Sequence, residues 1–429
     1  MHDVLYRIKQ YIRQKNRSRL ARRRLRTATN EAEHSSSPAP ATPGTVFLRH
    51  FPSCTPFRVY HIPQAKVPRV SLLTDSINSG SLYGGVGTAV LLGLEVAKTI
   101  GGKLRIVTRT EAAAPQHLAR FLRLQRYVPT EEIEFTYLSL NRKSRALDLL
   151  KDELLVTTSW WSTLAALKSV PKENLIYLLQ DDERIFYPLG DERISCEEVL
   201  RTPGLRFVIN SSLLKEHFRN EGLISLWENS THFEPAFPDH IYYKKTGKVR
   251  TRRLLFYAHP QNPRNLFHLG LRVLEEGIRR QILNTEVWKI IFVGKDLPAV
   301  EFCDGTSPKR FENMPWDEYA ALVREVDIGL ALMHAPHPSY PPLDVAASGG
   351  IAVSTSYGIK QDLARYSSDV LLAPPTVDGL VGALQKAIEE IEKRACGTAD
   401  APSSFHLPRS WNATLEPVAR WIAEGRETR

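Results

Sequence analysis

The sequence predicts an α/β protein made of two doubly wound parallel sheets, each covered by helices on both faces. From Arg69 onward, short apolar runs alternate with helical stretches, and the same alternation starts again after a polar stretch at residues 242–253. Runs that are apolar on both faces and separated by helices are typical of buried parallel strands. We therefore expect two Rossmann-like domains that face a central cleft. This cleft would lie at the carboxyl ends of both sheets, where such sheets bind ligands.

In the first domain, aliphatic runs bounded by polar residues predict six strands. They are expected at 70–75, 104–108, 133–138, 154–158, 175–180 and 204–209. The second domain is expected to alternate strands and helices. Its strands would lie at 254–258, 288–294, 327–332, 351–354 and 370–373, and its helices near 264–280 and 315–325, from about Pro341, and near 358–366 and 377–393.

These elements give four segments of the chain. The predicted segments are a basic helix and linker at 1–44, the first domain at 45–245, the second domain at 246–400 and a closing helical segment at 401–429. Trp411 and Trp421 in the last segment are available to pack back toward the first domain.

Composition fits an ordinary globular protein of 429 residues, with 42% hydrophobic and 24% charged residues. No run approaches the ~20 consecutive apolar residues that span a bilayer, and no apolar core follows the first charges, so no secretory signal is expected. The four cysteines are scattered, which favours reduced thiols in a cytoplasmic protein.

The net charge of +10 is concentrated at the start of the chain. Residues 1–27 hold ten Lys and Arg and one acid, Asp3, so the rest of the chain is nearly neutral. This argues against a nucleic-acid-binding surface over the whole protein. Val4, Leu5 and Ile8 recur at helical spacing, so an amphipathic helix on an anionic membrane surface and a solvated tail both remain open.

Three glycines open the first predicted helix. Gly84, Gly85 and Gly87 follow the first strand, where glycine allows close approach of a ligand and leaves helix amides free for an anion. The pattern is not GxGxxG, which disfavours a dehydrogenase. A tight turn that only packs the helix on the strand is the alternative.

Acidic residues end a buried strand of the first domain. Asp181, Asp182 and Glu183 follow Gln180 and precede Tyr187. Carboxylates in a cleft can act as bases or hold a cation. A solvated loop or a helix cap is the alternative reading, but the position at a strand's carboxyl end favours a site.

Basic residues follow two strands of the second domain. Arg264 and Asn265 come after the first strand, and Lys295 follows Gly294 at the end of the second. Because arginine presents a planar fork of donors that suits phosphate oxygens, Arg264 and Lys295 together predict a diphosphate site.

The stretch ALMHAPHPSYPPLDVAASGG, residues 331–350, joins a strand to a helix. Pro341 and Pro342 suit the first helical positions, and Ser339 is placed to cap the helix. Asp344 lies one turn inside and can accept hydrogen bonds from ligand hydroxyls. His334 and His337 have no evident third partner, so a metal site is not expected there.

These residues resemble those of GT-B glycosyltransferases. YGGVGTA, QDDERIFYP, PRNLF and HPSYPPLDVAASGG are similar to motifs of the bacterial rhamnosyltransferases that use dTDP-L-rhamnose to build cell-surface glycans. The resemblance covers roughly residues 69–395. It implies a GT-B fold, a retaining transfer and no metal or other cofactor. Many relatives carry a second glutamate eight positions before Asp344, where this chain has Pro336, so the resemblance leaves the sugar contacts open.

The resemblance also implies roles for individual residues. The catalytic residues would be Asp181 and Asp182, with Gln180, Glu183 and Tyr187 on the acceptor side. The donor would be bound by Gly85, Arg264, Asn265, Lys295, Asn313, Met314, Ser339, Tyr340 and Asp344.

We therefore expect a hexosyltransferase that moves L-rhamnose from dTDP-rhamnose to a hydroxyl of a glycan or lipid-linked glycan. The expected location is cytoplasmic, with peripheral contact between residues 1–27 and the inner face of the membrane as an open option. Two alternatives are a nucleotide-sugar epimerase of the same fold and a non-catalytic sugar-nucleotide-binding protein at a membrane surface. No nucleic-acid partner is expected.

Overall fold

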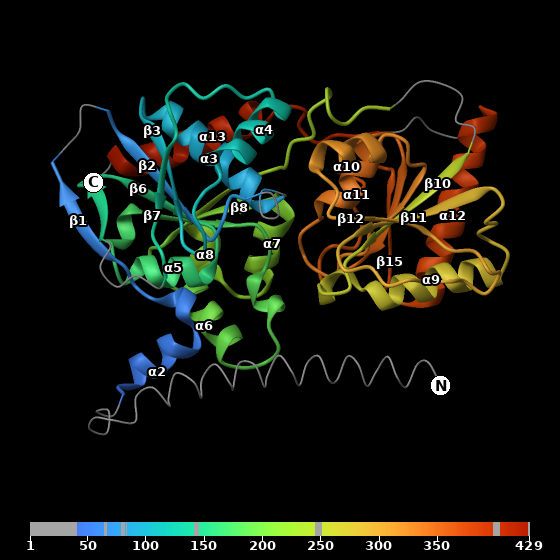
Figure 1. Ribbon diagram of the computed structural model, residues 1–429, viewed down its shortest axis with the longest axis horizontal. Helices are drawn as coiled ribbons and strands as arrows, with labels where there is room; N and C mark the ends of the chain where they lie inside the picture. The colour runs from blue at the N-terminus through green and yellow to red at the C-terminus, as the bar shows by residue number, and fades with distance from the viewer. Residues whose placement is uncertain are drawn as a thin grey trace. The chain divides into compact units, whose positions relative to one another are not determined.

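The computed structural model describes residues 41–63, 67–78, 82, 84–140, 146–244, 251–397 and 404–427 (Figure 1). The amphipathic helix expected at 1–27 lies outside this range. Residues up to Phe51 and residues from Pro52 onward form two units. The described part of the first unit holds one helix, α2 (Pro43–His50). The second unit contains the two large sheets, which are described next.

The first sheet has seven parallel strands in the order β4-β3-β2-β6-β7-β8-β9. They are β2 (Arg69–Thr74), β3 (Lys103–Thr108), β4 (Glu134–Tyr137), β6 (Leu154–Thr157), β7 (Leu175–Leu179), β8 (Arg206–Asn210) and β9 (Ser230–Phe233). In order of sequence this is the 3-2-1-4-5-6 arrangement of a Rossmann domain with one added strand, and the order reverses between β2 and β6.

The second sheet repeats this arrangement with six parallel strands in the order β12-β11-β10-β13-β14-β15. They are β10 (Arg252–Ala258), β11 (Trp288–Gly294), β12 (Lys309–Glu312), β13 (Ile328–Leu330), β14 (Ile351–Thr355) and β15 (Val370–Ala373). Phe256 of β10 pairs with Phe292 on one side and Leu330 on the other. The order reverses between β10 and β13, so each sheet has a switch point where ligands bind.

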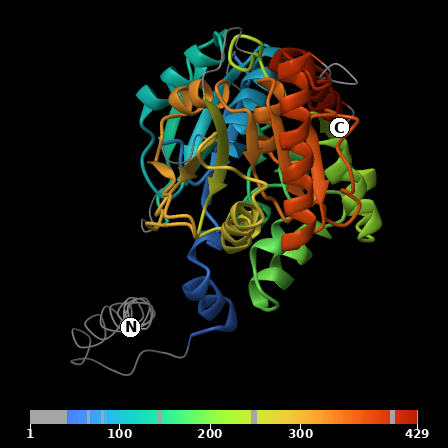
Figure 2. The ribbon, with the colours of Figure 1, turned by 90° about the vertical axis from the view of Figure 1, so that its right-hand side faces the viewer.

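Helices cover both faces of the second sheet. On one face, α9 (Phe267–Arg279) packs beside α12 (Val377–Cys396), as Figure 2 shows. On the other lie α10 (Trp316–Val323) and α11 (Tyr340–Ala347). Successive residues of β10 point to opposite faces, so Leu254 joins the α9–α12 core and Leu255 the α10–α11 core.

Helices also cover the first sheet. Its principal helix, α3 (Gly85–Thr99), packs against α13 (Trp411–Glu427). The remaining helices of this domain are α4 (Pro115–Leu124), α5 (Trp160–Leu167), α6 (Asp191–Leu200), α7 (Ser212–Asn220) and α8 (Ile224–Glu228). Since α13 follows the second domain in sequence but packs on the first, the chain passes between the two domains twice (Figure 1).

The predicted fold class, two Rossmann-like α/β domains, is confirmed, but several elements differ. The helix expected near 358–366 is absent and turns take its place. Gly358 has a φ of +49°, and the side chain of Lys360 is fully buried, which requires an irregular path. A small parallel sheet of β1 (Arg58–Ile62) and β5 (Ala146–Leu150), and the edge strands β9 and β12, were not predicted.

None of the helices in the described ranges is long and apolar enough to cross a membrane.

Candidate active site

A cavity of about 1170 Å³ lies between the two sheets, and residues of both domains line it. The lining includes every predicted site residue except Asp182 and Tyr187. Those that line it are Gly85, Gln180, Asp181, Glu183, Arg264, Asn265, Lys295, Asn313, Met314, Ser339, Tyr340 and Asp344. The cavity follows the carboxyl ends of both sheets, where backbone amides and side chains of the loops converge.

The second domain contributes basic residues at two neighbouring strand ends. A Cβ on Gly294, at the end of β11, would lie 1.6 Å from the carbonyl oxygen of Ala258 at the end of β10. Only glycine allows β10 and β11 to approach this closely, and Lys295 follows directly into the cavity wall. Arg264 enters the same wall from the 3₁₀ turn η4 (Pro263–Asn265) that follows β10.

Arg264 is paired across the domains. Its Nη1 donates to Oδ2 of Asp181 in an ion pair, and its guanidinium lies 4.0 Å from the ring centroid of Phe186. Asp181 is 8% exposed. Burial raises the pKa of its carboxyl group, while the positive charge of Arg264 opposes that shift. The predicted diphosphate arginine thus has a counterion from the first domain.

The two acids after Asp181 have other partners. Asp182 caps the 3₁₀ turn η3 (Glu183–Phe186) and accepts hydrogen bonds from Arg184 at 2.7 Å and His217 at 2.9 Å. Burial acts to raise its pKa, but these partners lower it to about 2. Glu183 accepts from the backbone N–H of Trp160 at 2.9 Å, and burial raises its pKa to about 8.

Tyr187 accepts a hydrogen bond from Trp160 Nε1 at 2.9 Å. Asp182 and Tyr187 therefore support the loop behind the wall and do not face the cavity, which corrects the predicted position of both residues. The chain turns at η3, so adjacent acids point in different directions.

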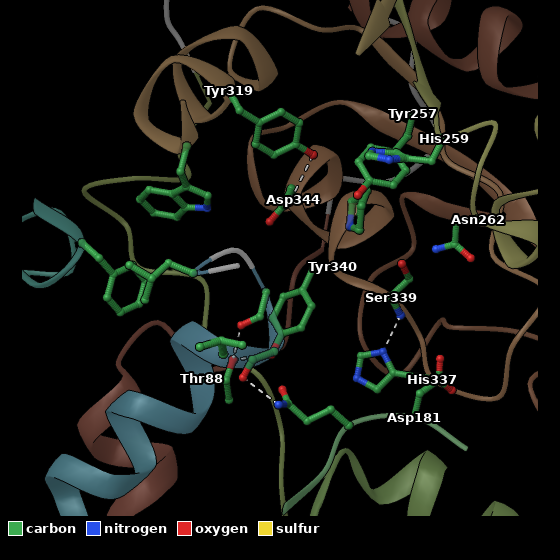
Figure 3. Close-up of a pocket in the computed structure, with 18 of the residues that line it drawn as sticks. Thr88, Asp181, Tyr257, His259, Asn262, Tyr319, His337, Ser339, Tyr340 and Asp344 are labelled. Carbon is green, nitrogen blue, oxygen red and sulfur yellow. Dashed lines mark hydrogen bonds between the residues drawn. The ribbon is translucent and has the colours of Figure 1, made fainter. Parts of the chain in front are cut away.

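Asp344 lies among hydroxyl groups, and no basic side chain of the described ranges pairs with it. Tyr319 donates to its Oδ2 at 3.2 Å, while its Oδ1 has no hydrogen-bond partner within the described ranges. Asp344 is 4% exposed, and burial raises its pKa to about 7 against the opposing effect of the Tyr242 and Tyr319 hydroxyls. Figure 3 shows Asp344 beneath Tyr319, close to Tyr340. Its free oxygen is suited to accept from a ligand hydroxyl.

Side chains from the second domain hold the loop between β13 and α11 in one conformation. Ser354 donates to the carbonyl of Ala331 at 2.7 Å, and Asn265 donates to that of Leu332 at 3.2 Å. Lys360 Nζ donates to the carbonyl of Met333 at 2.9 Å. Asn265, predicted to bind the donor, therefore supports the loop that borders the cavity.

The end of this loop differs from the prediction. Ser339 has a φ of +74°, and its side chain makes no capping bond to α11. Instead its backbone N–H donates to Nδ1 of His337 at 2.9 Å (Figure 3). The expected serine cap is thus replaced by a histidine that accepts from the backbone. Pro341 and Pro342 lie in the first turn as predicted.

Tyr340 connects the two domains at the cavity. Asn210 Nδ2 donates to its hydroxyl at 2.8 Å. The Thr88 hydroxyl lies 2.9 Å from the same oxygen (Figure 3). Asn210 and Thr88 belong to the first domain, while Tyr340 begins α11 of the second. A second contact, the ion pair between Arg120 and Asp317 at 2.7 Å, also bridges the domains at this cavity.

The first-domain wall contains an aromatic–acid pair that the sequence did not reveal. Trp161 Nε1 donates to both carboxylate oxygens of Asp75, at 3.1 and 3.3 Å, and both residues line the cavity. Burial raises the pKa of Asp75, and the bond from Trp161 opposes the shift. Asp75 ends the predicted first strand, so its position was a signal, but its partner lies 86 residues away.

Gln180 and the start of α3 complete this wall. Gly84 has a φ of +60° and begins the helix, and Gln180 Nε2 donates to the carbonyl of Gly85 at 2.6 Å. Within the described ranges, no three His, Cys, Asp or Glu side chains stand close enough together to hold a metal ion.

Two Rossmann-like domains with a cavity at the carboxyl ends of both sheets define a class: the chain has the GT-B glycosyltransferase fold. Two family models match it in succession. Residues 69–211 match WsaF, N-terminal domain, and residues 252–385 match WsaF, C-terminal domain. The ranges contain strands β2 to β8 and β10 to β15, so each match covers the body of one sheet.

The chain is also similar to one known protein and to solved structures. The O-antigen biosynthesis protein RfbC of Myxococcus xanthus is 28% identical over 276 residues, which are 63% of this chain and 20% of that protein. The chain thus spans about a fifth of the length of this relative. HepE of Anabaena in complex with UDP and glucose is similar with a TM-score of 0.53 and 12% identity, over 83% of this chain and 97% of that one. Sucrose-phosphate synthase of Thermosynechococcus elongatus has a TM-score of 0.51 and 10% identity, over 84% and 97%.

Proposed function

We propose that this chain is a glycosyltransferase of glycan or O-antigen biosynthesis that moves a hexose from a nucleoside diphosphate to a hydroxyl of a glycan. One observation carries the proposal: a cavity between two Rossmann-like domains, with Arg264 and Lys295 at neighbouring strand ends of the second. A leaving diphosphate needs positive charge and hydrogen-bond donors, and these residues supply both. The WsaF matches and the O-antigen relative support the same class of reaction.

The donor is assigned to the second-domain wall. Arg264 and Lys295 bind the diphosphate, and Asp344 accepts a hydrogen bond from the nucleoside sugar, whose 3′-hydroxyl is the free one in a dTDP donor, through its Oδ1. Asn313 and Met314 border the part of the cavity that receives the base. The complex of HepE with UDP and glucose supports a nucleotide-sugar donor. Within this class we propose dTDP-L-rhamnose as the donor, on the resemblance of the 331–350 stretch, and retention of configuration.

The acceptor is assigned to the first-domain wall, where Trp161 offers an aromatic face beside the Asp75 carboxylate. Asp181 is the acid that contacts the acceptor hydroxyl, since it faces the cavity and Asp182 does not. Arg264 touches both Asp181 and the proposed phosphate position, so donor binding and acceptor contact share one guanidinium. The cations named above can stabilise the leaving group, and we propose that no metal is required.

A panel of nucleotide sugars tests the donor. Thermal shifts would be measured for the full chain with dTDP-rhamnose, UDP-glucose and GDP-mannose, because a ligand that binds the folded state raises Tm. We expect stabilisation by dTDP-rhamnose above the others. Stabilisation by UDP-glucose alone would overturn the rhamnose assignment and keep the transferase. Absence of any shift, together with no sugar transfer, would overturn the proposal.

Product analysis separates the alternative enzymes. An epimerase would convert the donor sugar with no acceptor present, whereas a transferase releases nucleoside diphosphate in proportion to glycosylated acceptor. A non-catalytic binding protein would bind the donor without turnover. Attachment of residues 1–27 to an anionic membrane, one of the two options for this segment, predicts that deleting them lowers binding to vesicles containing anionic lipid and leaves donor binding unchanged; a solvated tail predicts no change in either.

A further inference from the structure

We infer that His337 is a phosphate-binding residue of this cavity: a neutral imidazole whose Nε2–H donates to the phosphate that joins the donor's nucleotide to its sugar. The inference deepens the proposed function and rests on it. It starts from an unsatisfied atom. His337 is 5% exposed and lines the cavity, yet its Nε2 has no hydrogen-bond partner in the described part of the chain. Buried polar atoms are nearly always paired, so an unpaired one at a cavity wall indicates a missing ligand.

The tautomer of His337 follows from its other nitrogen. The backbone N–H of Ser339 donates to Nδ1 at 2.9 Å, so Nδ1 is an acceptor and carries no proton. A neutral imidazole with an unprotonated Nδ1 carries its hydrogen on Nε2. The atom without a partner is therefore a donor, and it requires an oxygen of the ligand.

The position of this donor is fixed. Lys360 Nζ donates to the carbonyl of His337 at 3.3 Å and to that of Met333 at 2.9 Å, so one buried amine holds both ends of the turn. Ser339 adopts a φ of +74°, a conformation that non-glycine residues rarely hold, and this directs its N–H at the ring. A group oriented in this way loses little entropy when a ligand binds.

The charges around His337 indicate an anionic oxygen. Burial lowers the pKa of the ring to about 3, and the charges of Lys360 and Arg264 act in the same direction. Lys360 is itself buried, which lowers its pKa to about 7. The imidazole is thus neutral between two basic groups, which together favour a phosphate. Arg264 is the proposed diphosphate residue, so His337 lies where the second phosphate is expected.

Helix α11 explains why a side chain is needed here. Helix N-termini usually bind phosphate through free backbone N–H groups. In α11 the first turn contains Pro341 and Pro342, which have none, and the N–H of Ser339 already donates to His337. The turn can offer few amides to an anion. The Nε2–H of His337 supplies one hydrogen-bond donor at the N-terminus of α11. Figure 3 shows the ring between Ser339 and Asp181.

Nucleotides with one and two phosphates test the inference. Calorimetry on the full chain would compare dTDP with dTMP, and UDP with UMP. For His337→Phe we expect diphosphate affinity to fall about 10- to 100-fold, the range for a lost hydrogen bond to a charged group. Monophosphate affinity should change less than about 3-fold, because the missing contact is to the second phosphate. His337→Gln keeps a donor at similar reach and should recover part of the loss.

His334→Phe is the matched control. This histidine lies in the same loop, contacts Tyr357 and does not line the cavity, so its replacement should leave both affinities unchanged. The Kd ratio of His337→Phe to wild type should stay constant from pH 5.5 to 8, since the ring is neutral throughout and Lys360, whose pKa burial lowers to about 7, titrates in both proteins. A ratio that grows as the pH falls through 6.5 would show an imidazolium and overturn the inference.

Other outcomes separate the inference from the proposed function. Equal losses of monophosphate and diphosphate affinity would mean that His337 only shapes the pocket, and unchanged affinities would mean no contact; either overturns the inference alone. If wild type binds no nucleoside diphosphate, the proposed function fails too. Tm would be measured for each variant, and His337→Leu replaces the phenylalanine variant if that one does not fold.

Discussion

Asp181 and Asp344 are two buried carboxyl groups in one cavity with opposite surroundings. Asp181, from the first domain, pairs with Arg264 of the second, whereas the partners of Asp344 in the described part of the chain are hydroxyl groups. Burial raises both pKa values, to about 7 for Asp344. The comparison teaches that burial alone does not decide what an acid can do: Asp181 has a compensating charge that the ligand must share, and Asp344 has a free oxygen that the ligand can use.

The largest effect is expected when Asp181 loses its counterion. Arg264→Ala removes the proposed diphosphate contact and leaves Asp181 as a buried acid without its ion-pair partner, with only the weaker effect of Lys360 to oppose burial. Sugar transfer should fall about 100- to 1000-fold, as when a residue that stabilises developing charge is removed. Initial rates with saturating acceptor would measure this.

The control is Arg272→Ala, an exposed arginine on α9 outside the cavity, which should keep wild-type rates. The double variant Arg264→Ala with Asp181→Asn removes the uncompensated charge as well. If it recovered full activity, Arg264 would serve only to neutralise Asp181, and its assignment to the diphosphate would be wrong.

A smaller loss is expected for Asp344→Asn. The amide keeps the shape of the side chain but loses the charge and one acceptor, so affinity for a nucleoside diphosphate should fall about 10- to 100-fold by calorimetry. Tyr319→Phe, which removes only the hydroxyl that contacts Asp344, should cost less. Equal affinities for wild type and Asp344→Asn would contradict the contact with the nucleoside sugar.

The first-domain wall should respond differently. Trp161→Ala removes the aromatic face beside Asp75, and we expect the acceptor KM to rise about 10-fold while the Kd of the donor stays unchanged, since stacked aromatic contacts contribute about 1 kcal/mol beyond burial. Titration of each substrate separately measures both. A weakened donor with an unchanged acceptor KM would place the acceptor elsewhere.

The smallest effect concerns stability. The pKa of Asp344 is raised from 3.8 to about 7 in the folded chain, so folding favours its protonated form. Its stabilising contribution is present below pH 3.8 and is lost as the pH rises through about 7. Between pH 5 and 8, Tm of wild type should therefore fall by a few degrees relative to Asp344→Asn. Parallel Tm curves for the two proteins would contradict the raised pKa.

The sequence predicted the parts of the site that depend on strand ends. Arg264, Lys295 and Asp181 follow strands, and parallel strands bring their carboxyl ends together. Adjacent residues were harder, because Asp181 and Asp182 are equivalent in the sequence and only the turn at η3 separates their directions. Contacts between distant segments, such as Trp161 with Asp75, leave no local pattern.

Local secondary-structure propensity gave wrong predictions where tertiary contacts determine the path of the backbone. The segment around Lys360 reads as a helix, but burying its amine against the carbonyls of Met333 and His337 requires turns. Ser339 reads as a cap, and the imidazole of His337 takes its N–H instead. Ser339 lies in the loop between β13 and α11 that borders the cavity, and the segment around Lys360 packs against that loop.

The double passage of the chain between the domains limits how they can move. A body held by one tether can rotate about any axis through the point of attachment. Here the chain passes from the core of the first domain to that of the second between Ala236 and Phe237, and it returns between Leu407 and Trp411, before α13 packs on α3. Two attachment points define a line, and rotation about that line is the motion that both tethers leave free. The two domains are thus joined by two chain segments, and the packing of α13 on α3 anchors the second segment to the first domain.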